Sequence, residues 1–231
     1  MSTVLPPLEL FLVRHGRSEA DQLGVIECNA DFPLTHYGQQ QTHQLLAYLQ
    51  TQEYNFQALY ASPLLRASQT AIILAEALEL DMITDIRLAE KDVGQMAGLY
   101  REDAEKRFPL PPGGLMPHHK MGGGTGESML DFRFRLHECL WELREKHAGK
   151  SILLVSHGGA INEILHLLLQ VPEHVVFLSE DAVVHHLVWG EKVYLRLFNG
   201  HGHEPTPEPG TKQAPPQTEK NSETPDNQGT D

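Results

Sequence analysis

The sequence predicts an α/β domain built as a three-layer α/β/α sandwich with a mostly parallel central sheet. Short apolar runs typical of buried strands alternate along the chain with longer segments of helical periodicity. The first of these runs ends at a polar, Gly-containing turn, which suits a strand buried between two layers of helices. The 231 residues suffice for one sizeable domain and are few for two independent ones.

Each element follows from its local pattern. Strands are predicted where an apolar run is too short for a helix. The last two predicted strands are joined by a turn around Gly190. Helices are predicted where apolar residues recur every three or four positions, with Thr35 as an N-cap and Pro63 at a helix start. The predicted strands are residues 8–13, 58–61, 151–155, 183–188 and 192–198. The predicted helices are residues 36–49, 63–78, 101–107, 128–147 and 160–169.

The composition changes abruptly near Gly200. Residues 201–231 contain six prolines, six acidic residues and one member of the hydrophobic set, Ala214. So little apolar surface does not offset the entropy of ordering the chain. We therefore predict a folded domain over residues 1–200 and a disordered, acidic, Pro-rich tail over residues 201–231. A solvated terminus is the simpler interpretation of the tail, and a partner-binding peptide is the alternative.

The charge excludes two classes of protein. The chain carries 31 Asp and Glu against 18 Lys and Arg, a net charge of −13. Nucleic-acid binders and proteins held on anionic membranes need a basic surface, so neither nucleic acid nor a membrane is an expected partner. The two cysteines, Cys28 and Cys139, cannot form a multi-bridge disulfide framework, and no secretory signal or membrane span is evident. We expect a cytoplasmic protein.

The candidate chemistry lies just after the first three predicted strands. Arg14 and His15 follow the first, Arg66 comes soon after the second, and His157 and Gly158 follow the third. Ligands of such folds bind beyond the carboxyl ends of the strands. Arginine holds phosphate oxygens with two parallel hydrogen bonds, and a neutral imidazole between arginines can attack phosphorus. Each residue alone is a weak signal, but together they predict a phosphoryl site.

Six short motifs occur in order along the body of the chain. They are LVRHG at 12–16, PLTHYG at 33–38, SPLLRASQTA at 62–71, LAE at 88–90 followed by Gly94 and Gly98, GES at 126–128, and SHGG at 156–159. With them, residues 8–198 resemble the histidine phosphatase superfamily, also called the phosphoglycerate mutase-like family. The resemblance implies a phosphoglycerate mutase-like fold and a metal-independent, histidine acid-type phosphatase that needs no cofactor.

The resemblance also implies a role for each site residue. His15 would be the nucleophile that becomes a phosphohistidine, and Glu90 would protonate the leaving oxygen and then activate water. Arg14, Arg66 and His157 would complete the catalytic set by stabilising the transferring phosphoryl group. The implied phosphate ligands are Arg14, Ser18, Asp21, Arg66, His157 and Gly158.

Two positions depart from the family pattern. Asp21 stands where the family usually has an asparagine, and an ionised carboxylate there would repel phosphate. Asp21 could instead position Arg17 or tune the pocket, with Asn29 as a substitute amide donor. Asn162 stands where an arginine is common, and we interpret it as a change on the surface or beside the pocket.

Residues 108–126 are rich in Pro and Gly, and we predict a mobile flap over the pocket. Its residues His118, His119 and Lys120 either recognise an anionic substrate tail or lie in a solvated loop. Elsewhere, His185 and His186 are neighbours in a predicted strand, so they point to opposite faces and do not easily share an ion. We therefore predict no metal site.

The leading hypothesis is that the protein hydrolyses a small phosphomonoester, so the expected partner is a small phosphorylated metabolite. The sequence leaves the oligomeric state open, and a homodimer is one option. A phosphoglycerate mutase is the first alternative. Mutase-type relatives carry Trp-Asn after the first histidine, whereas this chain has Ala20-Asp21 and its tryptophans lie far away. A non-catalytic phospholigand-binding protein is the second, although both His15 and Glu90 are present.

Overall fold

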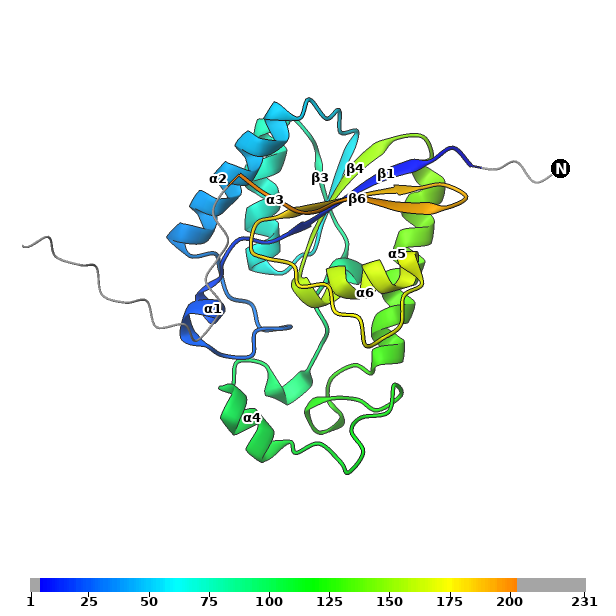
Figure 1. Cartoon of the computed structure of the whole chain (residues 1–231). Helices are drawn as coiled ribbons and strands as arrows, with labels where there is room; N and C mark the ends of the chain where they lie inside the picture. The colour runs from blue at the N-terminus through cyan, green and yellow to red at the C-terminus, as the bar shows by residue number, and fades with distance from the viewer. Residues whose placement is uncertain (1–4, 203–231) are drawn as a thin grey trace, which may run out of the picture.

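The computed structural model describes residues 5–202, so the predicted tail lies outside the described residues except for its first two positions. A six-stranded sheet with the order β3-β2-β4-β1-β5-β6 forms the centre (Figure 1). Strands β3, β2, β4 and β1 run parallel, β5 is antiparallel to β1, and β6 is antiparallel to β5. The strands are β1 (Leu8–Arg14), β2 (Ala58–Ala61), β3 (Met82–Thr84), β4 (Ser151–Ser156), β5 (Val184–Trp189) and β6 (Val193–Gly200).

Helices cover both faces of the sheet, which confirms the predicted three-layer α/β/α architecture. Leu10 and Leu12 of β1 pack in one core cluster with residues of α5 and α6, whereas Phe11 and Val13 pack in the other with residues of α2 and α3. This division follows from the strand period of two. The helices are α1 (Glu19–Leu23), α2 (His36–Thr51), α3 (Leu65–Ala77), α4 (Arg101–Arg107), α5 (Met129–Lys146) and α6 (Gly158–Leu169).

The sheet register brings three strand ends to one edge. Arg14 at the end of β1 is paired with Ser156 at the end of β4, and Ala61 of β2 is paired with Val155 of β4. The backbone N–H of His15 then donates to the carbonyl of Ser156 at 3.1 Å. Residues that follow these strands therefore leave the sheet side by side, as the sequence predicts.

Two short elements escape the sequence prediction. Strand β3 has three residues at the edge of the sheet and pairs only with β2, so it carries no buried apolar run. Helix α1 has five residues, too few for a periodic pattern, and is fixed by a capping box between Ser18 and Asp21. The longer helices begin and end within two residues of their predicted limits, and Thr35 caps α2 by accepting from the Gly38 N–H at 2.9 Å.

Helix α2 begins directly against the turn that follows β1. A Cβ on Gly38 would lie 2.1 Å from the carbonyl oxygen of Arg17, and a Cβ on Gly16 would lie 2.3 Å from the carbonyl oxygen of Gly38. The Arg17 carbonyl also accepts hydrogen bonds from the backbone and the hydroxyl of Thr35. The turn that carries the predicted nucleophile is thus locked against the start of a helix.

We expect Gly38→Ala to lower the free energy of unfolding by about 1–3 kcal/mol, because the obstacle is backbone that cannot move without breaking these hydrogen bonds. This expected change in the free energy of unfolding is opposite in sign to the effect of helix propensity, which favours alanine over glycine by about 1 kcal/mol. Urea unfolding measures the change, with the exposed neighbour Gln39 replaced by alanine as the control. A Gly38→Ala protein as stable as the Gln39→Ala protein contradicts the locked turn.

Candidate active site

The imidazole of His15 is buried at the end of β1 in the protonation state that a nucleophile needs. Its Nδ1 lies 2.8 Å from the carbonyl oxygen of Gly16, which can only accept, so Nδ1 carries the proton and Nε2 keeps its lone pair. Burial, reinforced by the Arg66 and Arg14 cations, holds the pKa of His15 well below its ordinary value. The ring is therefore neutral and its free nitrogen faces Arg66, whose Nε donates to it at 3.2 Å.

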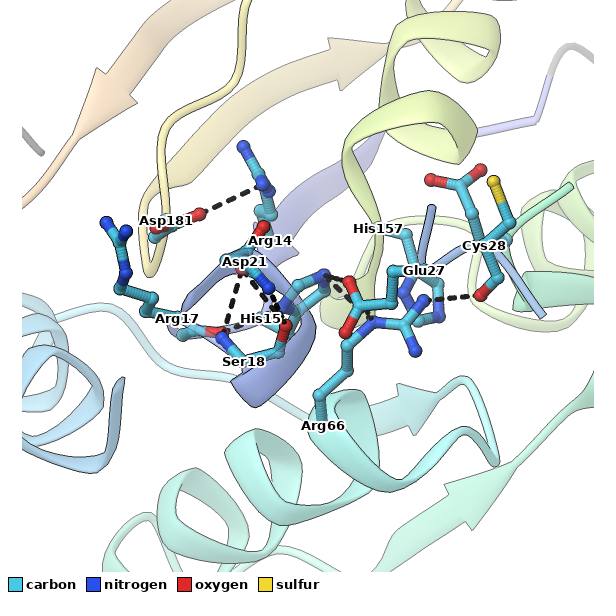
Figure 2. A network of polar contacts seen from close by, with 12 residues as sticks. Arg14, His15, Arg17, Ser18, Asp21, Glu27, Cys28, Arg66, His157 and Asp181 are labelled. Carbon is cyan, nitrogen blue, oxygen red and sulfur yellow. Dashed lines mark hydrogen bonds and ion pairs between the residues drawn. The ribbon is translucent and has the colours of Figure 1, made fainter. Parts of the chain in front are cut away.

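Arg66 lies in the first turn of α3 and its guanidinium is almost completely buried. Its Nη1 donates to the carbonyl of Ala30 at 3.0 Å and its Nη2 to the carbonyl of Cys28 at 2.7 Å. Its Nε also lies 3.0 Å from a carboxylate oxygen of Glu27. Glu27 and the carbonyls of Cys28 and Ala30 thus hold the guanidinium against the nucleophile, and Figure 2 shows Glu27 and Cys28 beside it.

Arg14, the last residue of β1, is fixed from the loop before β5. Its Nη2 lies 2.9 Å from Asp181 Oδ1, and its Nη1 donates to the carbonyl of Ser179. Its Nε is buried and has no hydrogen-bond partner among residues 5–202. A Cβ on Gly158 would lie 3.5 Å from this nitrogen, so the first turn of α6 passes close beside it. A buried donor without a partner is rare and suits a ligand oxygen.

His157, the N-cap of α6, lies next to His15 with 5.1 Å between the ring centroids. Its Nε2 is 2.7 Å from the hydroxyl of Ser62, which also accepts from the backbone N–H of Leu64. This favours the tautomer in which Ser62 donates to Nε2 and the ring proton is on Nδ1. Nδ1 is buried and finds no partner in the part of the chain that the structure describes. Burial and nearby Arg66 hold the pKa of His157 well below its usual range.

Glu90 is held at the start of α6. Its Oε2 accepts from the backbone N–H of Gly159 at 2.8 Å, and its Oε1 accepts from the N–H of Lys91 at 2.8 Å. A Cβ on Gly159 would lie 2.5 Å from Oε1, so the carboxylate can occupy this place only beside a glycine. The predicted acid therefore shares one helix terminus with His157.

Arg135 on α5 positions the backbone of the Glu90 segment. Its Nη1 donates to the carbonyls of Arg87 and Ala89, at 2.7 and 2.8 Å, and its Nη2 donates to the carbonyl of Glu90 at 3.0 Å. The remaining donors meet the carboxylate of Glu127 at 2.7 and 3.0 Å. One half-buried cation thus fixes the segment through three carbonyl groups.

Ser18, Asp21 and Asn29 make hydrogen bonds to neighbouring protein groups. Asp21 Oδ2 accepts from both the backbone N–H and the hydroxyl of Ser18, at 3.0 and 3.1 Å, so it caps α1. Asn29 Oδ1 accepts from the N–H of Val93 at 3.1 Å and joins the 27–30 segment to the Glu90 segment. Asn162 accepts from Phe177 in the loop after α6.

The flap covers a cavity of about 260 Å³. Leu115, Met116, Pro117 and His119 of the flap line it together with Lys91, the residue after Glu90. His118 and Lys120 are exposed and do not line it. Of the three flap residues considered above, only His119 lines this cavity, and Lys91 is the lining residue next to Glu90 in the chain.

Sequence reasoning missed four contributors to the site: Glu27, Asp181, Ser62 and Arg135. Ser62 lies within a recognised motif, which was a usable signal. The other three come from loops or from a helix face whose partners depend on the tertiary fold.

The histidine pair on β5 serves the core. His185 contacts the hydroxyl of Ser179 at 2.8 Å, whereas His186 stacks on Phe11 with ring centroids 4.0 Å apart. Among the described residues, no group of three or more His, Cys, Asp or Glu is arranged to hold a metal ion. Within residues 5–202 no helix has both the length and the apolar character to cross a membrane, and both cysteines are free thiols.

Comparison with known proteins gives consistent matches. The sequence matches the histidine phosphatase superfamily (branch 1) over residues 10–192. A probable phosphoglycerate mutase GpmB of Yersinia pestis is 35% identical over 174 residues, covering 72% of this chain and 77% of the relative.

Solved structures of phosphatases share the fold. A mycobacterial glucosyl-3-phosphoglycerate phosphatase complexed with VO3 superimposes with a TM-score of 0.71 at 22% identity, covering 83% of this chain and 99% of the other. A putative α-ribazole-5′-P phosphatase of Escherichia coli K-12 gives a TM-score of 0.72 at 24% identity, covering 85% and 99%.

Proposed function

The chain belongs to the histidine phosphatase superfamily, and on that premise we propose that it is a metal-independent phosphatase that hydrolyses a small phosphomonoester through a phosphohistidine on His15. One observation supports this above others. The buried Arg14 Nε and His157 Nδ1 have no partner within the described chain, and they lie close to a neutral imidazole whose Nε2 lone pair faces Arg66 Nε. Two donors and one nucleophile in this arrangement suit a tetrahedral phosphoryl group.

The first chemical step forms the phosphohistidine. Arg14, Arg66 and His157 bind the phosphoryl oxygens, and His15 Nε2 attacks phosphorus in line with the leaving oxygen. The phosphorus–nitrogen bond forms as the phosphorus–oxygen bond breaks, and protonated Glu90 donates its proton to the leaving alcohol. In the second step Glu90 takes a proton from water, which attacks phosphorus and releases His15.

The remaining predicted phosphate ligands have smaller roles in this proposal. The N–H of Gly158 is in the first turn of α6, where helix donors favour anions. The Ser18 hydroxyl lies beside the nucleophile turn, while Asp21 acts through Ser18 because its carboxylate caps α1. The leaving group extends toward the cavity under the flap, which begins at Lys91 directly after Glu90.

The purified protein is expected to release phosphate from a chromogenic aryl phosphate in the presence of a chelator, because the proposed steps use only side chains and water. A panel of phosphorylated metabolites then ranks the substrates by kcat/KM. Inertness toward the whole panel favours the phospholigand-binding alternative.

A phosphoglycerate mutase is the second candidate function, because the Yersinia pestis relative is named as a probable phosphoglycerate mutase. Incubation with 3-phosphoglycerate and a bisphosphoglycerate primer separates the two functions. We expect slow hydrolysis or no reaction, because Ala20 and Asp21 replace the Trp-Asn of mutase-type relatives. Rapid isomerisation to 2-phosphoglycerate contradicts the proposed phosphatase.

A further inference from the structure

One carboxyl group inside the phosphoryl pocket has no role in the proposed steps. Glu27 Oε2 lies 3.0 Å from Arg66 Nε and 4.0 Å from His15 Nε2, and the side chain is only 13% exposed (Figure 2). The carboxylate thus lies against both the guanidinium that must hold the phosphoryl group and the nitrogen that must attack it.

A bound phosphoryl group and ionised Glu27 compete for the same place. Phosphorus must come within about 3–3.5 Å of His15 Nε2 for in-line attack. Glu27 Oε2 lies just beyond that distance and forms an ion pair with Arg66, 3.0 Å from the Nε whose N–H donates to His15 Nε2. A phosphoryl oxygen brought to this edge of the guanidinium would lie against the Glu27 carboxylate, and like charges at such separations repel each other strongly in a buried site.

The other carboxyl oxygen of Glu27 points to a neutral form of the acid. Oε1 is buried without a hydrogen-bond partner among the described residues, an expensive arrangement for a charged carboxylate. Burial raises the pKa of Glu27 to about 7, although the Arg66 cation favours the ionised form. Asp21 raises that pKa further, and Arg14 lowers it.

We propose that the protonation state of Glu27 controls whether the pocket binds a phosphoryl dianion. The ionised carboxylate occupies the phosphoryl position beside Arg66. The neutral acid leaves that position free and donates a hydrogen bond to a phosphoryl oxygen. A buried carboxylic acid that stays neutral can serve as such a donor. The inference rests on the proposed function, because it takes the His15–Arg66 pocket as the phosphoryl site.

The proposal fixes the sign of a pH dependence. Above the pKa of Glu27, binding a dianion requires the uptake of one proton, so affinity falls as pH rises. With a pKa of about 7, the fall between about pH 6 and about pH 8.5 amounts to about 30-fold. His15 and His157 do not contribute, because burial keeps the pKa of each well below this interval. Cys28 stays a thiol there, since burial raises its pKa to about 12.

Sulfate is a suitable probe because it remains a dianion throughout this interval. Calorimetric titration of the wild-type protein is expected to show about 30-fold weaker sulfate binding at about pH 8.5 than at about pH 6. Glu27→Gln keeps the shape and a donor but cannot ionise, so its affinity should be equal at both pH values and exceed that of the wild type at the higher one.

Glu19→Gln is the matched control, because it removes the same charge from an exposed position in α1 and should keep the wild-type pH dependence. Two results would overturn the role of Glu27 and leave the proposed phosphatase function standing. One is a wild-type protein that binds sulfate equally at both pH values, and the other is a Glu27→Gln variant whose sulfate affinity still falls at the higher pH. If neither protein binds sulfate, the proposed phosphoryl site itself is wrong and the inference falls with it. If the Glu27→Gln protein does not fold, Glu27→Ala replaces it, and we expect its sulfate affinity to be independent of pH as well.

Discussion

Replacement of His15 by alanine is expected to abolish phosphate release, with a loss in kcat on the order of 10⁴-fold or more. In the proposed mechanism, the His15 imidazole is the protein group that forms a covalent bond to phosphorus. Its Nδ1 donates to the Gly16 carbonyl, and its Nε2 lone pair faces Arg66. His157 cannot replace it, because Ser62 contacts its Nε2.

Two measurements separate loss of the nucleophile from loss of the fold. The wild-type protein, quenched during turnover of a radiolabelled substrate, should retain an acid-labile label that His15→Ala lacks. His147→Ala is the control, since His147 is also buried but pairs with Tyr60 at 2.8 Å. That variant should lose stability and keep its label. Label on the His15→Ala protein, or activity within tenfold of wild type, would show that another group attacks phosphorus.

The central part of this site could be predicted from the sequence because the sheet register determines it. Arg14, His15 and His157 follow strands whose apolar runs are unmistakable, and parallel pairing of β1 with β4 brings their ends together. Arg66 lies in the first turn of a helix whose start Pro63 signals. Short-range patterns therefore contain enough information for these four side chains.

The rest of the site depends on contacts between segments that have no periodic pattern. Glu27 reaches Arg66 because residues 27–30 fold over the start of α3, and Asp181 reaches Arg14 from 167 positions away in the chain. Arg135 has an ordinary position on a helix, and only the tertiary fold shows that it binds three carbonyls. Asp21 shows the converse, because its carboxylate accepts from the nearby Ser18 in a local capping box.

Gly159→Ala is expected to lower kcat by about 10²-fold without unfolding the protein. The added Cβ would meet Glu90 Oε1 at 2.5 Å and Oε2 at 2.9 Å, and the end of that side chain is the part free to move. Displacement of a catalytic group by about 1 Å costs about 10²-fold. Stability should be equal or higher, because alanine favours the helix over glycine by up to about 1 kcal/mol.

The dependence on the leaving group identifies the cause of this loss. An aryl phosphate leaves readily without a proton, whereas an alkyl phosphate needs the acid, so Gly159→Ala should reduce kcat much more for the alkyl ester. Gly158→Ala is the matched variant in the same turn of α6, because its Cβ would come no closer than 3.5 Å to Arg14 and does not approach Glu90. Any loss in that variant should be equal for both esters. Equal losses for both esters in Gly159→Ala would mean that Glu90 does not protonate the leaving oxygen, since displacing the acid must cost most where the leaving group needs it most.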